Sequence, residues 1–311
     1  MRNILSNKFS WLAFFSIVFL ATACEDVIDV ELEEGDNQLV VDAWINDLDQ
    51  NQIIKLRRTS PYFDASFSPA ETGATVTITE SDGTVYNFLD ANNNGDYTWT
   101  PSGGNTFGTV GNGFQLDIEL SSGKTFQSFA LKNRTTPVDS IAVEFREEEL
   151  GQPEGFYCEF FGRDPVGPGD TYWIKTFKNG EFLNKPSEIN IAFDASFTPG
   201  AMVDGVTFIT PIRSFVNRIP DSGDDATDTN DIAPWAEGDS IRVEIHSLNF
   251  VAFEFIEQAQ TQLTLGDAGI FTEPPANVPT NIISLDGTDA ADVPVGFFNV
   301  SSVSSMERRI E

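Results

Sequence analysis

A string of oxygen-bearing side chains between residues 90 and 96 is the most chemically suggestive pattern in the chain. Aspartate and asparagine occupy alternate positions around a glycine at the sixth place, and these residues are Asp90, Asn92, Asn94 and Asp96. The spacing matches the first half of a calcium-binding loop. The twelfth position, which needs a bidentate glutamate, is Pro101. Because asparagine and glycine also tolerate the positive φ of tight turns, the string predicts either a calcium site or a turn between strands.

A second acidic run, at residues 220–234, holds five aspartates, among them Asp224, Asp225 and Asp228. These carboxylates could gather around a cation or contact a partner, but a high density of like charge more often indicates a solvated loop. Trp235 follows the run directly and is the best candidate for a surface ring that contacts a ligand or partner, with Tyr62 second. The alternative is that either ring is buried and packs its loop against the core.

Residues with catalytic potential are few. His246 is the only histidine, and in the run SIRVEIHSL it alternates with three apolar residues, which predicts that its side chain points to solvent. Cys158 lies in the apolar run GFYCEFFG and is expected to be a small buried residue. The chain carries no sequence signature of a serine, cysteine or metal-dependent hydrolase. The sequence therefore predicts a non-enzymatic protein. A glycan or peptide hydrolase is the less favoured alternative, because any two of the 48 acids could meet in space.

Short alternating segments from residue 38 to 131 must position the calcium candidate. They are rich in Val, Ile, Thr and aromatic residues and are separated by turn sequences such as SDG, NNNGD and SSGK. The segments are QLVVDAWI, IIKLR, ATVTIT, TVYNF, GDYTW, FQLDIEL and TFQSFAL. In FQLDIEL the apolar residues Phe114, Leu116 and Ile118 alternate with polar ones, so one face is dry. Seven such strands predict an immunoglobulin-like β-sandwich over residues 38–131.

The polar run KNRTTP, at residues 132–137, predicts a domain boundary because it ends in proline and breaks the strand pattern. Residues 138–311 contain further strand-like segments, including DSIAVEF, TYWIKTF and the closing VGFFNVSSV. A single amphipathic helix is predicted near residues 249–263. Its apolar residues recur at spacings of three and four, at Phe250, Phe253, Ile256, Ala259 and Leu263. The whole protein is therefore predicted to be mainly β, with a second β-rich domain that carries one α-helix.

The first 23 residues resemble a bacterial lipoprotein signal peptide. A short basic start precedes the apolar run WLAFFSIVFLATA, which is too short to span a bilayer. The string LATAC resembles a lipobox, which implies that Cys24 is diacylated and becomes the new N-terminus. Residues 24–37 are strongly acidic and predict an extended tether. The alternatives are a plain secretory signal that ends at Ala23 and a buried helix.

The charge of the chain restricts its partners. Removing residues 1–23 takes away Arg2 and Lys8 but no acid, so the formal net charge moves from −30 to −32. So negative a field repels phosphate backbones, and no cluster of Lys and Arg offsets it, which argues against nucleic-acid binding. Contact with an anionic membrane surface is disfavoured for the same reason. The lipid on Cys24 is then the predicted attachment to the membrane.

Short motifs occur in order along nearly the whole mature chain: CEDVIDVEL, LVVDAWI, GATVTITESDG, GDYTW, PVDSI, TYWIK, PPANVPTNI and VGFFNVSSV. This set resembles a family of uncharacterised Bacteroidetes outer-membrane lipoproteins, domain of unknown function 4249, whose members are typically encoded beside TonB-dependent receptors. The resemblance implies a lipid anchor in the outer membrane, at the cell surface or otherwise on the periplasmic face. It also implies an accessory that binds or gates a TonB-dependent transporter, with no catalytic residues to carry over. A calcium-assisted surface adhesion or structural module is the alternative.

Overall fold

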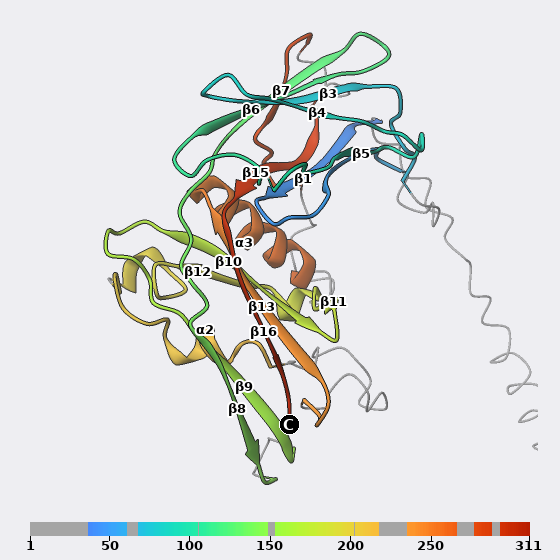
Figure 1. Ribbon diagram of the computed structural model, residues 1–311. Helices are drawn as coiled ribbons and strands as arrows, with labels where there is room; N and C mark the ends of the chain where they lie inside the picture. The colour runs from blue at the N-terminus through green and yellow to red at the C-terminus, as the bar shows by residue number, and fades with distance from the viewer. Residues whose placement is uncertain are drawn as a thin grey trace, which may run out of the picture. The chain divides into compact units, whose positions relative to one another are not determined.

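The computed structural model describes residues 37–60, 68–104, 106–148, 153–201, 203–217, 235–265, 277–287 and 293–311. The predicted signal peptide, Cys24 and the predicted tether up to residue 36 lie outside these ranges, as do Tyr62, Asp224, Asp225 and Asp228. Within them the chain is mainly β, as the sequence predicts, and forms several sheets (Figure 1). No helix among these residues combines the length and the apolar character that a membrane crossing demands.

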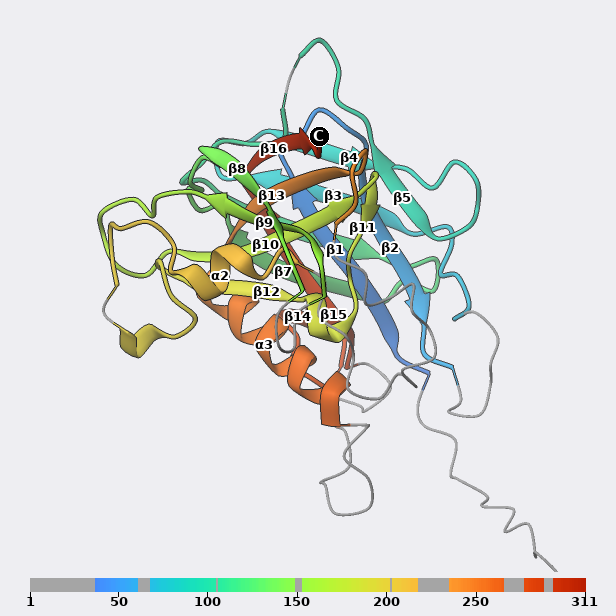
Figure 2. The ribbon, with the colours of Figure 1, turned by 90° about the horizontal axis from the view of Figure 1, so that it is seen from below.

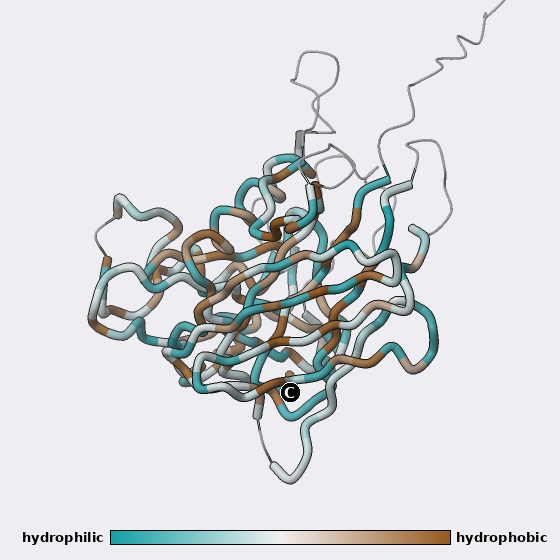
Figure 3. Tube along the Cα trace, turned by 90° about the horizontal axis from the view of Figure 1, so that it is seen from above, coloured by the Kyte–Doolittle hydropathy of each residue, from teal (hydrophilic) through white to brown (hydrophobic). Residues whose placement is uncertain are grey.

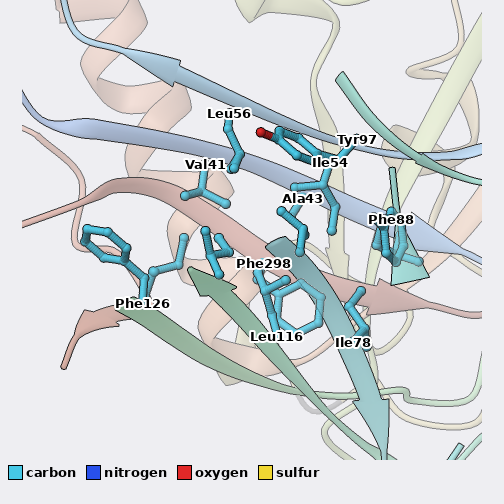
Figure 4. Packing of buried hydrophobic residues seen from close by; sticks show 14 of the residues in the cluster. Val41, Ala43, Ile54, Leu56, Ile78, Phe88, Tyr97, Leu116, Phe126 and Phe298 are labelled. Carbon is cyan, nitrogen blue, oxygen red and sulfur yellow. The ribbon is translucent and has the colours of Figure 1, made fainter. Parts of the chain in front are cut away.

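The segment from residue 38 to 131 forms a β-sandwich whose strands correspond to the seven predicted segments. One sheet contains β1 (Leu39–Asn46), β2 (Gln52–Arg58) and β5 (Asp96–Trp99). The other contains β3 (Thr75–Glu80), β4 (Val85–Phe88), β6 (Gly113–Glu119) and β7 (Thr125–Leu131). Hydrophobic and hydrophilic residues alternate along the strands (Figure 3), because successive side chains point to opposite faces of the sheet. The inward faces share one apolar core, in which Val41 and Ile54 meet Leu116 and Phe126 (Figure 4).

Two strands from the C-terminal region complete this sandwich. β14 (Ile282–Ser284) pairs with β7, and β15 (Val295–Ser301) runs parallel to β1 from Val40↔Val295 to Asn46↔Ser301. The sheet orders are therefore β15-β1-β2-β5 and β14-β7-β6-β3-β4. From the sequence, VGFFNVSSV is predicted to belong to the second region. In the structure its first seven residues, Val295–Ser301, pair with β1 instead, because alternation identifies a strand but not the sheet that receives it.

A third sheet follows the order β11-β10-β13-β16, and β12 also pairs with β10. Its strands are β10 (Thr171–Lys178), β11 (Glu181–Phe182), β12 (Asn190–Phe193), β13 (Ser240–Leu248) and β16 (Val303–Arg309). A separate hairpin consists of β8 (Ser140–Arg146) and β9 (Gly155–Phe161). Two 3₁₀ helices, η1 (Pro186–Glu188) and η2 (Pro199–Ala201), and the short helix α2 (Thr210–Ser214) were not predicted. The hairpin and this sheet enclose a second core around Cys158, Tyr172 and Val243.

The predicted helix is present as α3 (Phe250–Leu265), but it buries a narrower face than expected. Asn249 caps its start, since the Asn249 Oδ1 accepts a hydrogen bond from the Ala252 N–H at 2.8 Å. Phe253 and Ile256 are buried as predicted, whereas Phe250 and Leu263 are 47% and 58% exposed. Figure 2 shows α3 beside β12 and β15, which it contacts. The spacing of apolar residues predicts which face of a helix is apolar. It does not predict how much of that face the neighbouring sheets cover.

The run at residues 132–137 is not a solvated linker. Lys132 and Thr136 are buried, and the Lys132 ammonium forms an ion pair with Asp47 at 3.0 Å. The Asn133 Nδ2 donates to the carbonyl of Leu248, and the Thr135 hydroxyl donates to the carbonyl of Ile245. The polar side chains that suggested exposure are instead satisfied by neighbouring backbone. The two-domain division at this run stays a prediction.

Candidate functional site

An open pocket of about 550 Å³ lies between the β3–β4 hairpin and the loop that joins β5 to β6. This volume is within the usual range of small-molecule sites. Its described walls combine two acids, two aromatic residues and three threonines, which are Glu80, Asp82, Tyr86, Trp99, Thr84, Thr106 and Thr109. Asp82 and the threonines are exposed, whereas Glu80 and Tyr86 are buried. The pocket is therefore a candidate small-molecule site within the described residues.

Glu80 ties the hairpin to the loop. Its side chain is 3% exposed and lies on the inward face at the end of β3. One carboxylate oxygen accepts hydrogen bonds from the Thr109 N–H and the Asn112 amide, both at 2.8 Å. The other oxygen accepts a hydrogen bond from the Tyr86 hydroxyl at 2.8 Å. Three donors offset the cost of burying a carboxylate, so Glu80 acts as a fixed anchor of the pocket wall.

The aromatic wall is held by the same network. Burial, together with the bond to Glu80, raises the pKa of the Tyr86 hydroxyl above its ordinary value, so this hydroxyl stays protonated and donates. The Tyr86 ring meets the Trp99 ring edge to face at 5.3 Å between centroids, and Phe107 lies 4.1 Å from Tyr86. Trp99 is only partly buried. Packing against Tyr86 and Phe107 therefore holds the partly exposed Trp99 ring in place at the pocket.

Three carboxylates from separate loops converge elsewhere, at Asp164, Asp194 and Asp204, with one oxygen of each within 4.8 Å of the others. Tyr172 and the Gly205 N–H donate to Asp164, at 2.7 and 3.0 Å. Asp194 accepts from the N–H groups of Gly169 and Asp170. Burial raises the pKa of the Asp164 carboxyl above its usual range. Oxygen ligands of this kind could hold a hard cation such as calcium.

The predicted calcium residues form a turn between β4 and β5. The two Asp90 oxygens accept hydrogen bonds from the N–H groups of Asn94 and Gly95, at 3.1 and 2.9 Å. The Asn94 Oδ1 accepts from the Asp96 N–H, and the Asp96 carboxylate pairs with Arg57. Asn92 is exposed in the same turn. These partners match the turn alternative, and a cation at Asp90, Asn92, Asn94 and Asp96 stays a prediction.

Trp235 is 3% exposed, which corrects the expectation of a surface ring. Its backbone pairs with Phe156, and the Lys178 ammonium lies 5.4 Å from the centre of the ring. The other members of the predicted contact set, Asp224, Asp225 and Asp228, lie outside the described residues. Trp235 therefore packs in the second core, which agrees with the alternative prediction that its ring holds the loop against the core. Contact of the aspartates with a partner stays a prediction.

The expectation for His246 is wrong. Its side chain lies on the face of β13 opposite the apolar residues, as alternation requires, but it is only 4% exposed. Its Nε2 lies 2.9 Å from an Oε of the equally buried Glu244. Alternation assigns the face of a sheet, and only packing decides whether that face meets solvent. Cys158 is fully buried, as predicted, and burial raises the pKa of its thiol to about 12.

Sequence reasoning missed the pocket residues, although one of them left a signal. In ATVTITE the inward positions are Val76, Ile78 and Glu80, so an acid stands where alternation demands an apolar residue. A charged residue at a strand position that faces the apolar core indicates a group that is paired or functional. Trp99 and the threonines gave no comparable signal, because their proximity depends on how the loop folds back over the hairpin.

Comparison with known families gives one finding. Residues 25–307 match the family model described as a domain of unknown function (DUF4249). No curated protein sequence matches the chain.

Proposed function

Because the chain belongs to the DUF4249 family, and because a lipobox-like string precedes the matched region, we propose that it is a lipid-anchored envelope protein. The family match begins at residue 25, directly after Cys24, and this is where a mature lipoprotein would continue from its acylated cysteine. In this proposal the protein binds or gates a TonB-dependent transporter of the outer membrane. It captures a ligand near the transporter and performs no reaction.

The pocket beside Glu80 is the observation that carries this proposal. Both Glu80 oxygens accept hydrogen bonds, from three donors in all, and the Tyr86 hydroxyl is one of these donors, so the two side chains hold the wall of the pocket in place. Aromatic rings and hydroxyls around a preformed hollow are features of recognition sites. A lipid anchor would keep the pocket near the membrane and raise its effective concentration at a transporter.

Affinity capture from the outer membrane tests the proposed partner. The full chain would be purified from detergent-solubilised membranes of its own host, and we expect a TonB-dependent receptor to co-purify with it. Cys24→Ala is the matched variant, since it removes the acylated side chain and is expected to lower recovery of both proteins in the membrane fraction. Repeated recovery of the wild-type chain without a receptor would contradict the transporter role.

The cluster of Asp164, Asp194 and Asp204 favours a second candidate function, a calcium-assisted adhesion or structural module. Like charges this close repel one another, and a bound cation would stabilise the folded state by mass action. Under this candidate, calcium raises the melting temperature of the wild-type chain and EDTA lowers it. Asp204→Asn should abolish most of that shift, whereas Asp90→Asn should not. A melting temperature indifferent to calcium in the wild type would remove this candidate.

A further inference from the structure

We propose that the pocket between the β3–β4 hairpin and the β5–β6 loop binds an organic cation, a ligand with an ammonium or guanidinium group on an apolar stem. This inference rests on the proposed binding function of the pocket and adds the chemical class of its ligand. Three features carry it: the charge of the walls, the hydrogen-bonding capacity that remains free, and the aromatic surface.

The charge of the walls is negative. Glu80 and Asp82 contribute carboxylates, and none of the described residues that line the pocket is basic. The ammonium of Lys132 approaches the loop from the protein interior, where it contacts the carbonyls of Phe107 and Gly108, but it is paired with Asp47 at 3.0 Å. The formal charge of −30 adds an attractive long-range field for cations. Anionic ligands such as phosphates and carboxylates are disfavoured by the same charges.

The hydrogen-bonding capacity of the walls favours a ligand that donates. Three main-chain donors at the pocket are already used, because the N–H groups of Thr84, Gly108 and Thr109 donate to Asp82, Tyr86 and Glu80. The Tyr86 hydroxyl also donates to Glu80. Asp82 accepts hydrogen bonds from the backbone N–H and the hydroxyl of Thr84, but its exposed carboxylate has lone pairs beyond these two, and the hydroxyls of Thr106 and Thr109 can accept. An ammonium or guanidinium has donors only, so it complements this set.

The aromatic surface fits the same ligand. Tyr86 is buried and its ring packs against Phe107 and Trp99, so the apolar part of the lining comes from the partly buried Trp99 and from Val85, which is 52% exposed. A cation is attracted to the face of an aromatic ring, and an alkyl stem can pack on Trp99 and Val85. In the proposed pose the cationic head reaches Asp82 at the rim, and the stem lies against the apolar wall. A neutral ligand would gain the packing but not the attraction between opposite charges at Asp82.

Calorimetric titration of the detergent-solubilised full chain tests the proposal, with cadaverine as the probe and 1,5-pentanediol as its neutral counterpart. We expect cadaverine to bind with an affinity that falls as salt rises, and the diol to show no measurable binding. Asp82→Asn keeps the oxygen that accepts from Thr84 but removes the charge, and should weaken cadaverine binding about tenfold. Asp286→Asn is the matched control, since Asp286 also accepts a backbone N–H, from Thr125, but does not line the pocket.

Three results would overturn the assignment. The first is no cadaverine binding up to about 10 mM, and the second is equal binding of the diol. The third is an equal loss of affinity in Asp82→Asn and Asp286→Asn, or no loss in either, which would indicate diffuse attraction to an acidic surface. These outcomes are separable from the proposed function, because capture of a receptor from the outer membrane does not depend on cadaverine.

Discussion

At the scale of single residues, the pair of His246 and Glu244 couples stability to pH. Desolvation lowers the pKa of His246 to about 4, and the nearby Lys175 ammonium on β10 acts in the same direction. The Glu244 carboxylate opposes this shift of the His246 pKa. Burial raises the pKa of Glu244, but the combined effect of His246 and the positive charges of Arg242 and Lys175 is larger, so the pKa of Glu244 is lowered. The folded protein therefore holds His246 neutral at pH values where the unfolded chain would protonate it.

We predict that the free energy of unfolding decreases as pH falls from about 6.5 towards 4. The unfolded state binds more protons than the folded state in this window, so stability is fully present above the unfolded pKa and is lost as pH falls. Depression of the His246 pKa from 6.5 to about 4 corresponds to ~3 kcal/mol at most. His246→Gln should flatten this dependence in urea titrations between pH 7 and 5. A slope that is the same in both proteins would contradict the assignment.

A second prediction concerns the buried ammonium of Lys132, which has 2% of its side-chain surface exposed and pairs with Asp47. Asp47→Asn keeps an oxygen for the N–H of Val303 but removes the charge that compensates Lys132. We expect a loss of about 3 kcal/mol in the free energy of unfolding, because an uncompensated charge is left in the interior. Glu144→Gln is the control, since its pair with Arg146 is similarly short but exposed, and it should change stability by less than about 1 kcal/mol.

At the scale of elements, the parallel pairing of β1 with β15 depends on Gly296. This residue has φ +101°, and a Cβ there would lie 2.0 Å from the carbonyl oxygen of Val41. The close approach is what allows β15 to join the edge of the first sheet. The closing segment can then continue as β16, which pairs with β13, so β15 and β16 belong to different sheets although only one residue separates them.

We therefore predict that Gly296→Ala lowers the free energy of unfolding by about 3 kcal/mol or more, through backbone strain and the clash with Val41. Gly238→Ala is the matched control. Gly238 has a similar φ of +92° but no atom within 4 Å of the added Cβ, so its substitution should cost only about 1 kcal/mol. Equal losses in the two variants would show that strain alone acts at both positions and that β15 does not depend on the close approach.

At the scale of the whole molecule, the sandwich depends on distant chain. Phe298 and Val300 of β15 and Ile282 of β14 belong to its apolar core, although they lie more than 150 residues beyond the end of β7. A fragment that ends at residue 137 would lack these side chains and would expose the edges of β1 and β7 to pairing with other molecules.

We predict that a fragment of residues 37–137 does not unfold cooperatively on its own, whereas the chain that retains β14 and β15 does. Circular dichroism and urea titration would measure this, and aggregation of the fragment is the expected accompaniment. Cooperative unfolding of the isolated fragment would instead support the independent domain that the sequence predicts over residues 38–131.

The sequence by itself determined the β class, the seven strands of the sandwich and a helix near residues 249–263, because these depend on local periodicity. It also determined the lipobox-like string, the strongly negative charge and the family resemblance, which the family match confirmed. These features can be read from neighbouring residues alone.

Only the tertiary structure decided which sheets receive β14 and β15, that His246 and Trp235 are buried, and that Lys132 pairs with Asp47. It alone brought Glu80, Tyr86 and Trp99 together around a pocket. The physical reason is that alternation assigns a side chain to a face, while the partner of that face is chosen by contacts between segments far apart in the chain.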